Sequence, residues 1–236
     1  MNGFARQLAA TSIALLGSFA SVGVAGDLRM AGGATVVIAT PGAPPKLVYE
    51  IDPGGIRPLT GAGLIFGNTK HEYADQITAR LHDAGFDVAA CLSSGLKDQL
   101  TKRGMHVREA GVDHGLVSGY PQRLPQQRRP VIADSEFLLD PVIQEFGFVV
   151  KRNERVRLTM AVSAWIDSGS QSWRSPLLAV NPTQMARMMR SKLIEIPGLT
   201  TWRDRMELEV NVEDVSKGFG FACQEMARAL VDEFPW

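Results

Sequence analysis

An alternation of apolar and polar side chains from Val156 to Ile166 constrains the fold of this chain more than any other feature. Apolar residues recur there at every second position, and most of the positions between them are polar. Successive side chains of a β-strand point to opposite faces of the sheet, so this run predicts a strand with one buried and one wetter face. Strand-like apolar runs also occupy residues 137–150 and 173–180, and short polar segments join all three. The sequence therefore predicts an antiparallel meander in the middle of the chain.

Helices and strands take turns before the meander. Apolar residues at helical spacing predict a helix over residues 70–84, which Gly85 ends, and Phe86–Ala90 is expected as a strand. A second helix beginning near Ser93 and a strand at Met105–Val107 repeat that order. A helix, a glycine and a strand in succession, found twice, indicate an α/β module rather than an all-β sandwich.

Two further helices are predicted after the meander. The first begins at Asn181 and ends before Pro197 and Gly198, with an apolar side that consists of Met185, Met188, Met189 and Ile194. The second occupies residues 214–233, where apolar residues recur at every third or fourth position as one buried stripe. Together the elements predict an α/β (α+β) fold, with a mixed sheet, an antiparallel central meander and helices packed on one face.

The N-terminal residues have the three-part pattern of a secretory signal peptide. A single positive charge, Arg6, precedes the nineteen uncharged residues Leu8–Gly26, which are rich in Ala, Leu and Val. An uncleaved membrane anchor is the alternative, because a spanning helix needs about 20 apolar residues. We expect a signal peptide at 1–26, a Pro/Gly-rich arm at 27–60 and an α/β domain at 61–236. Such a chain is expected in the periplasm or secreted, with outer-membrane association as a further option.

Composition narrows the classes of partner and cofactor. Lys plus Arg and Asp plus Glu each number 25. The chain therefore lacks the excess of positive charge that would indicate nucleic acid as a partner. Cys91 and Cys223 are too few for a structural zinc site. In an oxidising compartment they could form a disulfide, and two buried free thiols are the alternative. Because the sequence also lacks HExxH, P-loop, GxSxG and CxxC motifs, we predict no cofactor and no metal site.

Several polar residues are nevertheless of types that serve in catalysis. Asp134, Glu136 and Asp140 would share one strand face, either as an acid/base pair or, more simply, as a solvated face. Ser118 resembles a hydrolase nucleophile only loosely, since Leu116 replaces the glycine that the strained turn requires. We predict no catalytic residue among them. Surface or turn positions are expected for the four histidines: His71, His82, His106 and His114.

Arginine and tryptophan side chains are the candidates for an interface. Arg123, Arg128 and Arg129 lie in a polar, proline-containing loop that would suit an anionic partner, such as a lipid headgroup or an acidic protein. A solvated loop is the alternative. Trp165 falls on the otherwise polar face of its strand, where it either serves a protein interface or lies under a helix. Trp173, at the start of the third apolar run, is the second aromatic candidate.

The middle of the chain resembles a group of bacterial envelope proteins. Ala133–Leu139, Glu145–Gly147 and Ile166–Trp173 follow the rhythm ADAxL, EYG and LxDxxT/SGxxxW of that group. Its members include the periplasmic domain of the curli-secretion channel protein, the amino-terminal domain of TolB and transport-auxiliary lipoproteins. This chain departs from many of them because no cysteine stands near the cleavage region for lipid attachment.

The resemblance implies a non-catalytic, exported component of an envelope assembly, a secretion complex or a transport system. It also implies an envelope complex or further copies of the chain as partners, at the periphery of the membrane. Two alternatives stay open. One is a periplasmic hydrolase that uses the acids or Ser118, and the other is a carrier that holds a lipid or small molecule between helices and sheet.

Overall fold

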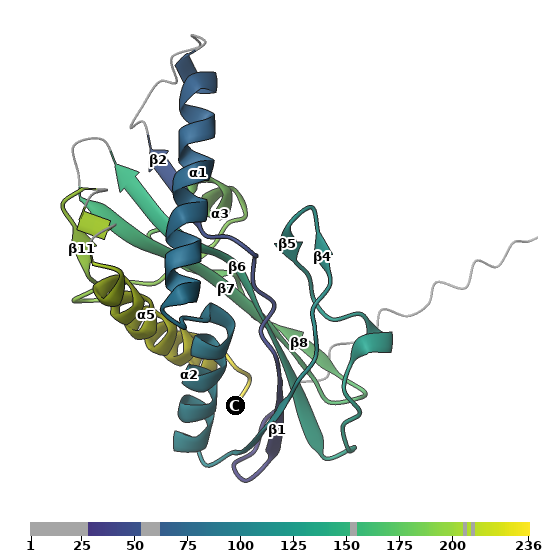
Figure 1. Cartoon of the computed structure of the whole chain (residues 1–236). Coiled ribbons are helices and arrows are strands. Elements are labelled where there is room, and N and C mark those ends of the chain that lie inside the picture. Colours follow the sequence, from purple (N-terminus) through teal and green to yellow (C-terminus); the bar gives the residue numbers. More distant parts are fainter. Residues whose placement is uncertain (1–27, 53–61, 152–154, 205–206, 209–210) are drawn as a thin grey trace, which may run out of the picture.

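The computed structural model describes residues 28–52, 62–151, 155–204, 207–208 and 211–236 (Figure 1). Within them, one sheet contains β1 (Thr35–Ala39), β2 (Val48–Asp52), β3 (His106–Ala110), β6 (Glu136–Lys151), β7 (Val156–Asp167), β8 (Ser172–Arg174), β9 (Leu178–Val180), β10 (Lys192–Leu193) and β11 (Thr201–Trp202). A separate hairpin joins β4 (Leu116–Val117) to β5 (Tyr120–Pro121). The helices are α1 (Ala62–Asp83), α2 (Val88–Lys102), α3 (Gln184–Met188), α5 (Val212–Asp232) and the short 3-10 helix η1 (Gln126–Arg128).

The central meander is confirmed. β6 and β7 pair antiparallel from Leu138 opposite Asp167 to Val150 opposite Val156, and β8 and β9 pair antiparallel with β7. The pairing register shifts between Ile143 and Glu145. A β-bulge of this kind inserts one extra residue and changes which face the following side chain occupies. As a result Ile143 points to the helices, whereas Glu145, only two residues later, points to the opposite face.

Parallel pairing surrounds this meander and makes the sheet mixed, as predicted. β1 lies between β3 and β6 and is parallel to both, while β2 is parallel to the distal part of β6. Gly147 of β6 has a φ of +150°, and a Cβ there would lie 1.9 Å from the carbonyl oxygen of Val48. The predicted arm therefore contributes two strands to the sheet, β1 and β2. The predicted signal peptide lies outside the described residues.

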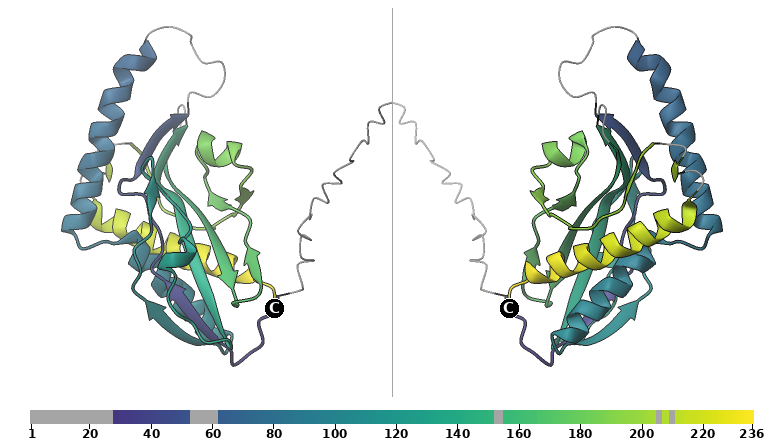
Figure 2. Two further views of the ribbon diagram at one scale, coloured as in Figure 1. Left: turned by 90° about the vertical axis from the view of Figure 1, so that its right-hand side faces the viewer. Right: turned by 90° about the vertical axis from the view of Figure 1, so that its left-hand side faces the viewer.

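Helices α1, α2 and α5 cover one face of the sheet (Figure 2). Phe219 of α5 is fully buried there, with its ring 5.8 Å from that of Phe146 and 5.6 Å from that of Phe148. Helices α2 and α5 cross closely at Gly95, where a Cβ would lie 3.0 Å from the Cβ of Ala227. None of the helices in the described residues combines the length and the hydropathy that crossing a bilayer requires.

The opposite face of the sheet is also covered, which the sequence analysis did not expect. Thr159, Ser163 and Asp167 are all buried. The second face of β7 therefore carries more polar residues than the first, but these polar side chains are shielded from solvent. The long connection from β3 to β6 lies over one part of this face, and α3 packs over another through Ala186. The prediction that the helices pack on one face of the sheet is therefore confirmed for α1, α2 and α5 and wrong for α3.

Two local predictions are wrong for identifiable reasons. Phe86–Ala90 does not form a strand, because the Asp87 carboxylate accepts hydrogen bonds from the backbone N–H groups of Ala89 (2.8 Å) and Ala90 (3.2 Å) and so caps α2. An N-cap of this kind stabilises the start of a helix by about 0.5–2 kcal/mol, which here outweighs the β-propensity of the first residues. The helix expected after Asn181 stops at Met188, and the chain then enters β10.

Candidate functional site

The three acids that the sequence places together occupy different environments. Asp134 is exposed. Two hydrogen bonds from Arg108, of 3.0 and 2.7 Å, lower the pKa of Glu136 to about 2, with a smaller contribution from the backbone N–H of Ala133. Asp140 is fully buried. The prediction of a solvated position is therefore right for Asp134 and wrong for Asp140. Glu136 forms an ion pair and is not placed for proton transfer.

Asp140 instead meets a histidine that was expected at the surface. The His114 side chain is 4% exposed, and its Nε2 lies 3.2 Å from Asp140 Oδ1, while Nδ1 lies 2.7 Å from the carbonyl oxygen of Gln122. The backbone N–H of Leu124 donates to the other carboxylate oxygen at 3.0 Å. Burial raises the pKa of Asp140, and the positive charge of His114 opposes that rise. His114 and Asp140 thus meet as a close charged contact without hydrogen-bond geometry, while the contact with Gln122 lies within the loop and that with Leu124 connects the loop to β6.

The arginines of that loop extend the same buried network. Arg123 bonds to the Asp167 carboxylate, and Arg129 Nη1 lies 3.1 Å from it. The Arg123 guanidinium also lies over the Trp165 ring at 5.6 Å, and that of Arg174 lies over the ring at 4.8 Å. Three of the residues predicted for an interface thus connect the loop to β7 within the chain. The other two lie apart from this network: Arg128 is exposed at the end of η1, and Trp173 packs edge-on against Phe234 at 5.7 Å.

Ser118 owes its setting to turn geometry. Ser118 and Gly119 are the two residues between β4 and β5, with φ values of 51° and 82°. Two consecutive positive φ values are what the type I′ turn of a two-residue hairpin requires. Of the remaining histidines, His82 and His106 are exposed as expected, and the side chain of His71 lies outside the described residues. Within the described part of the chain, His, Cys, Asp and Glu form no group of three or more that could hold a metal ion.

The two cysteines come together where α2 crosses α5. Both are free thiols, Cys91 half-buried and Cys223 buried. A hydrogen bond with Cys91 raises the pKa of the Cys223 thiol well above its usual value, and burial raises it further. The two candidates for a disulfide therefore lie side by side as thiols, and the disulfide itself stays a prediction.

A groove between β6, β7 and the segment from β10 to β11 was not predicted from the sequence. It has a volume of about 1230 Å³ and lies where the end of β6 and the start of β7 meet the segment from β10 to β11. Val149 of β6 and Thr201 of β11 both pair with Arg157 of β7, so three strands bring these side chains to one wall. Arg155 directly precedes β7 and lines the groove together with Arg157.

The opposite end of the groove is formed by the turn into α3. Asn181 has a φ of 42° and donates from Nδ2 to the carbonyl oxygen of Leu158 at 2.9 Å. Thr183 caps α3 and donates to the buried Glu145 carboxylate from its hydroxyl at 2.6 Å and its backbone N–H at 3.2 Å. The β-bulge of β6 therefore fixes the helix that presents Arg187 to the groove.

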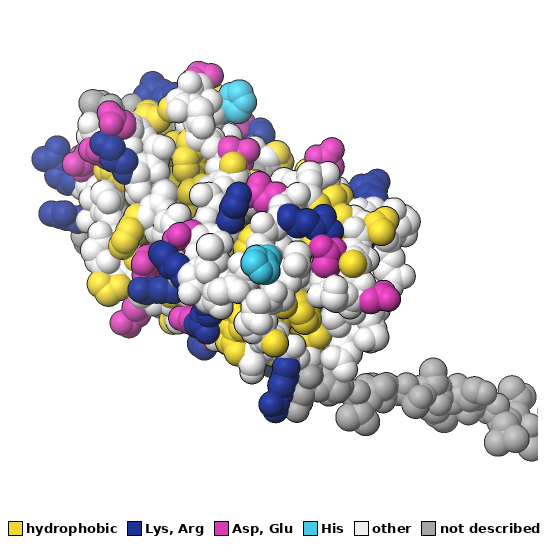
Figure 3. Space-filling model, turned by 90° about the horizontal axis from the view of Figure 1, so that it is seen from below, with side chains coloured by type: hydrophobic (Ala, Val, Ile, Leu, Met, Phe, Trp, Pro, Cys, Tyr) yellow, Lys and Arg dark blue, Asp and Glu magenta, His cyan; other side chains and the backbone are white. Residues whose placement is uncertain are grey.

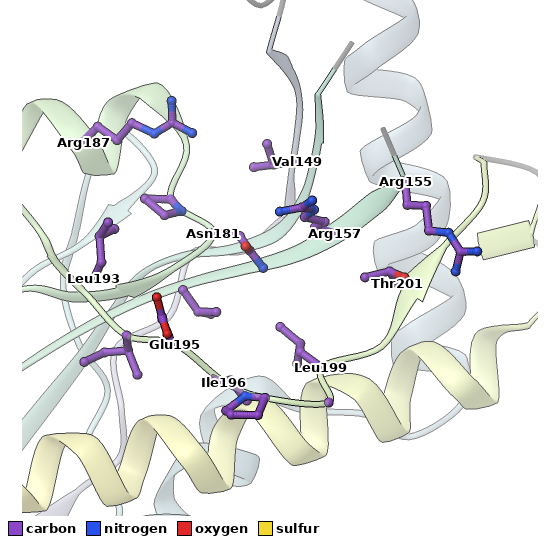
Figure 4. A pocket seen from close by; sticks show the side chains of 15 residues that line it. Val149, Arg155, Arg157, Asn181, Arg187, Leu193, Glu195, Ile196, Leu199 and Thr201 are labelled. Carbon is purple, nitrogen blue, oxygen red and sulfur yellow. The ribbon is translucent and has the colours of Figure 1, made fainter. Parts of the chain in front are cut away.

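Charge and apolar surface occur together in this groove. Figure 4 shows Arg157 between Arg187 on one side and Arg155 on the other. Glu195 is the single acid among the described lining residues, beside the three arginines. The apolar part of the lining consists of Val149, Val180, Pro182, Leu193, Ile194, Ile196, Pro197 and Leu199. On the face seen from below, by contrast, cationic and anionic side chains are interspersed (Figure 3).

This arrangement suits binding rather than bond-breaking. Guanidinium groups bind carboxylate and phosphate in a bidentate manner, and apolar walls hold hydrocarbon. The signal was present in the sequence as the pair Arg155 and Arg157, which flank the first residue of the alternating strand. It went unrecognised because Arg187 and the segment of residues 193–201 are distant in the chain.

Comparisons with known proteins add little. No protein-family model matches the sequence, no curated protein matches it, and the resemblance to the curli-secretion and TolB domains thus has no support at that level. A solved structure of a Xanthomonas campestris protein of family DUF330 is similar, with 11% identity, a TM-score of 0.35, and 84% of this chain and 82% of that chain covered. A second one, described as an uncharacterized protein, has 11% identity, a TM-score of 0.33 and coverages of 86% and 95%.

Proposed function

We propose that this protein is a non-catalytic, exported component of a cell-envelope assembly, and that it binds an anionic amphiphile in its arginine-lined groove. An amphiphile here means a molecule with a hydrocarbon part and a phosphate or carboxylate headgroup. The observation that carries the proposal is the convergence of Arg155, Arg157 and Arg187 on one apolar-walled groove. The proposal joins two of the functions that the sequence leaves open, the envelope component and the carrier.

The polar residues considered for catalysis have structural roles that fit this proposal. Both ring nitrogens of His114 face oxygen atoms, and Asp140 is enclosed by His114, Leu124 and Arg123. Ser118 forms a hairpin turn. Arg155 and Arg187 are exposed residues that line the groove. A binding role therefore uses groups that the fold leaves accessible.

The location rests on the N-terminal pattern. An uncharged, Ala- and Leu-rich stretch preceded by one arginine is typical of a signal peptide. Mass spectrometry of the mature protein from periplasmic extracts tests this part directly, since cleavage near Gly26 is expected. An intact N-terminus on protein from the cytosol would contradict it.

Binding is tested with lysophosphatidylglycerol, a single-chain anionic lipid, below the concentration at which it forms micelles. Isothermal titration calorimetry compares the wild type with the triple variant Arg155→Gln, Arg157→Gln, Arg187→Gln. A hydrogen bond to a charged group contributes about 1.5–3 kcal/mol, so each arginine that contacts the headgroup accounts for at least about tenfold in Kd. We expect at least a hundredfold loss in the triple variant.

The matched control is Arg203→Gln, which removes an arginine whose side chain is 83% exposed and which lies outside the groove. Its affinity should equal that of the wild type. Lysophosphatidylcholine, whose headgroup has no net charge, should bind the wild type more weakly. Equal affinity for the two lipids, or an unchanged Kd in the triple variant, would refute an anion-selective groove.

A further inference from the structure

A cluster of exposed apolar side chains lies beside the groove. It consists of Met185, Met188, Met189 and Leu193, hereafter the methionine patch. Met188 and Leu193 are each 65% exposed, and an apolar patch is more informative than either residue alone. Contiguous exposed apolar surface in a soluble domain marks an interaction site more often than a single exposed residue does.

The orientation of α3 explains why these side chains face outward. Ala186 is buried against Ala161 and Ala179 of the sheet, so the small residue of the helix faces the core. The three methionines stand three and four positions apart and therefore share one side of the chain, away from Ala186. The methionines were predicted to line the apolar side of this helix, and that side is exposed to solvent. Burying Ala186 rather than the methionines leaves the larger apolar area in solvent.

Positive charge surrounds the patch. From Gln184 to Leu193 the chain carries Arg187, Arg190 and Lys192 and no acid. Both arginines belong to exposed residues, and Lys192 pairs with Glu233 of the C-terminal segment. Arg187 and Leu193 also line the groove, so the patch and the groove are continuous. A surface of flexible apolar side chains set among arginines complements the interface of an anionic bilayer, where acyl chains lie beneath phosphate groups.

We propose that the methionine patch docks the protein on an anionic lipid bilayer, with the methionines and Leu193 entering the headgroup region and Arg187 and Arg190 facing phosphates. The inference deepens the proposed function, because a groove that opens beside a bilayer can exchange an amphiphile with it. Docking and groove binding are nevertheless separable events. The patch can bind vesicles when the groove is impaired, and the groove can bind dispersed lipid when the patch is impaired.

The test is co-sedimentation of the mature protein with vesicles of phosphatidylcholine alone and of phosphatidylcholine mixed with phosphatidylglycerol. Binding is expected to the mixed vesicles and to weaken as salt increases, because the surface potential is screened. Met188→Gln and Leu193→Gln, made separately, should each weaken binding about tenfold through the loss of buried apolar area. Arg187→Gln with Arg190→Gln should weaken it about thirtyfold.

The control for the patch variants is Val131→Gln, which changes a residue that is 94% exposed in the loop before β6. It should leave vesicle binding unchanged. Circular dichroism of the patch variants and of Val131→Gln should match the wild type, since these changed side chains are exposed. In addition, Met188→Gln should bind dispersed lysophosphatidylglycerol as the wild type does, whereas Arg155→Gln with Arg157→Gln should lose that binding and keep most vesicle binding.

Three outcomes would overturn docking by this patch. The first is vesicle binding that Met188→Gln and Leu193→Gln leave unchanged. The second is equal binding to vesicles with and without phosphatidylglycerol. The third is sedimentation equilibrium in which the wild type dimerises without binding vesicles and Met188→Gln is monomeric, which would assign the patch to a second copy of the chain. None of these results bears on the affinity of the groove for dispersed lipid, so the two proposals fail separately.

Discussion

Replacing Asp140 with alanine tests whether the buried network holds the loop between β3 and β6 on the sheet. The substitution removes an acceptor from the backbone N–H of Leu124 at 3.0 Å and the counter-charge of His114 at 3.2 Å. Removing one member of a buried ion pair costs about 3–5 kcal/mol. Because burial raises the pKa of Asp140, the native carboxylate is itself held at a cost, and we expect the lower end, about 3 kcal/mol.

The measurement is the free energy of unfolding from urea titrations, with thermal unfolding as a second readout. For a chain of this length, a loss of about 3 kcal/mol corresponds to a fall in Tm of about 6–12 °C. Asp134→Ala is the matched control, since this acid of the same segment is exposed, and its effect should stay within about 0.5 kcal/mol.

A double-mutant cycle adds the partner. His114→Ala in the Asp140→Ala background should cost less than His114→Ala alone, with a coupling energy of about 0.5–3 kcal/mol. A loss below about 1 kcal/mol for Asp140→Ala, or equal effects at Asp134 and Asp140, would refute the network as the anchor of the loop.

Three further predictions concern other parts of the fold. Gly147→Ala should lose about 3 kcal/mol or more of unfolding free energy in urea titrations, because the new Cβ would lie 1.9 Å from a backbone oxygen of β2. The control is Gly111→Ala, whose Cβ would have no atom within 4 Å and whose effect should stay within about 0.5 kcal/mol. The pKa of Glu136 is lowered from 4.5 to about 2, so its ion pair contributes stability above pH 4.5 that is lost as the pH falls toward 2. The difference in unfolding midpoint between wild type and Glu136→Gln should therefore shrink over that window. A constant difference would contradict this expectation. Because burial and hydrogen bonding raise the pKa of Cys223, iodoacetamide should label Cys91 first in the reduced, folded protein and Cys223 only after unfolding, which peptide mass spectrometry can follow.

The local pattern of the sequence was sufficient to predict the larger elements. Strict alternation gave β7 nearly to its residue bounds, and a stripe at helical spacing gave α5. Both signals are strong because each element buries one continuous face, and that face must repeat with the period of the element. Where a short segment carried a competing signal, as the Asp87 cap did against the β-propensity of the residues after it, the prediction was wrong.

The candidate site could not be predicted from local sequence patterns. Arg123, Arg129 and Trp165 were identified by residue type, yet only the folded chain joins them to Asp167 and to one another. His114 could not be recognised as buried, because its burial depends on a loop that crosses β6 at Asp140.

The sequence by itself determined the class of fold, the meander and the long helices, since these depend on periodicities that are local to each segment. Only the tertiary structure decided that the second face of the sheet is covered, that α3 buries an alanine and exposes methionines, and that Arg155, Arg157 and Arg187 share a groove. The physical reason is that amphipathicity tells which side of an element is apolar, whereas the parallel pairing of β1 and β2 with β6 and the bulge at Glu145 decide which distant segments that side meets.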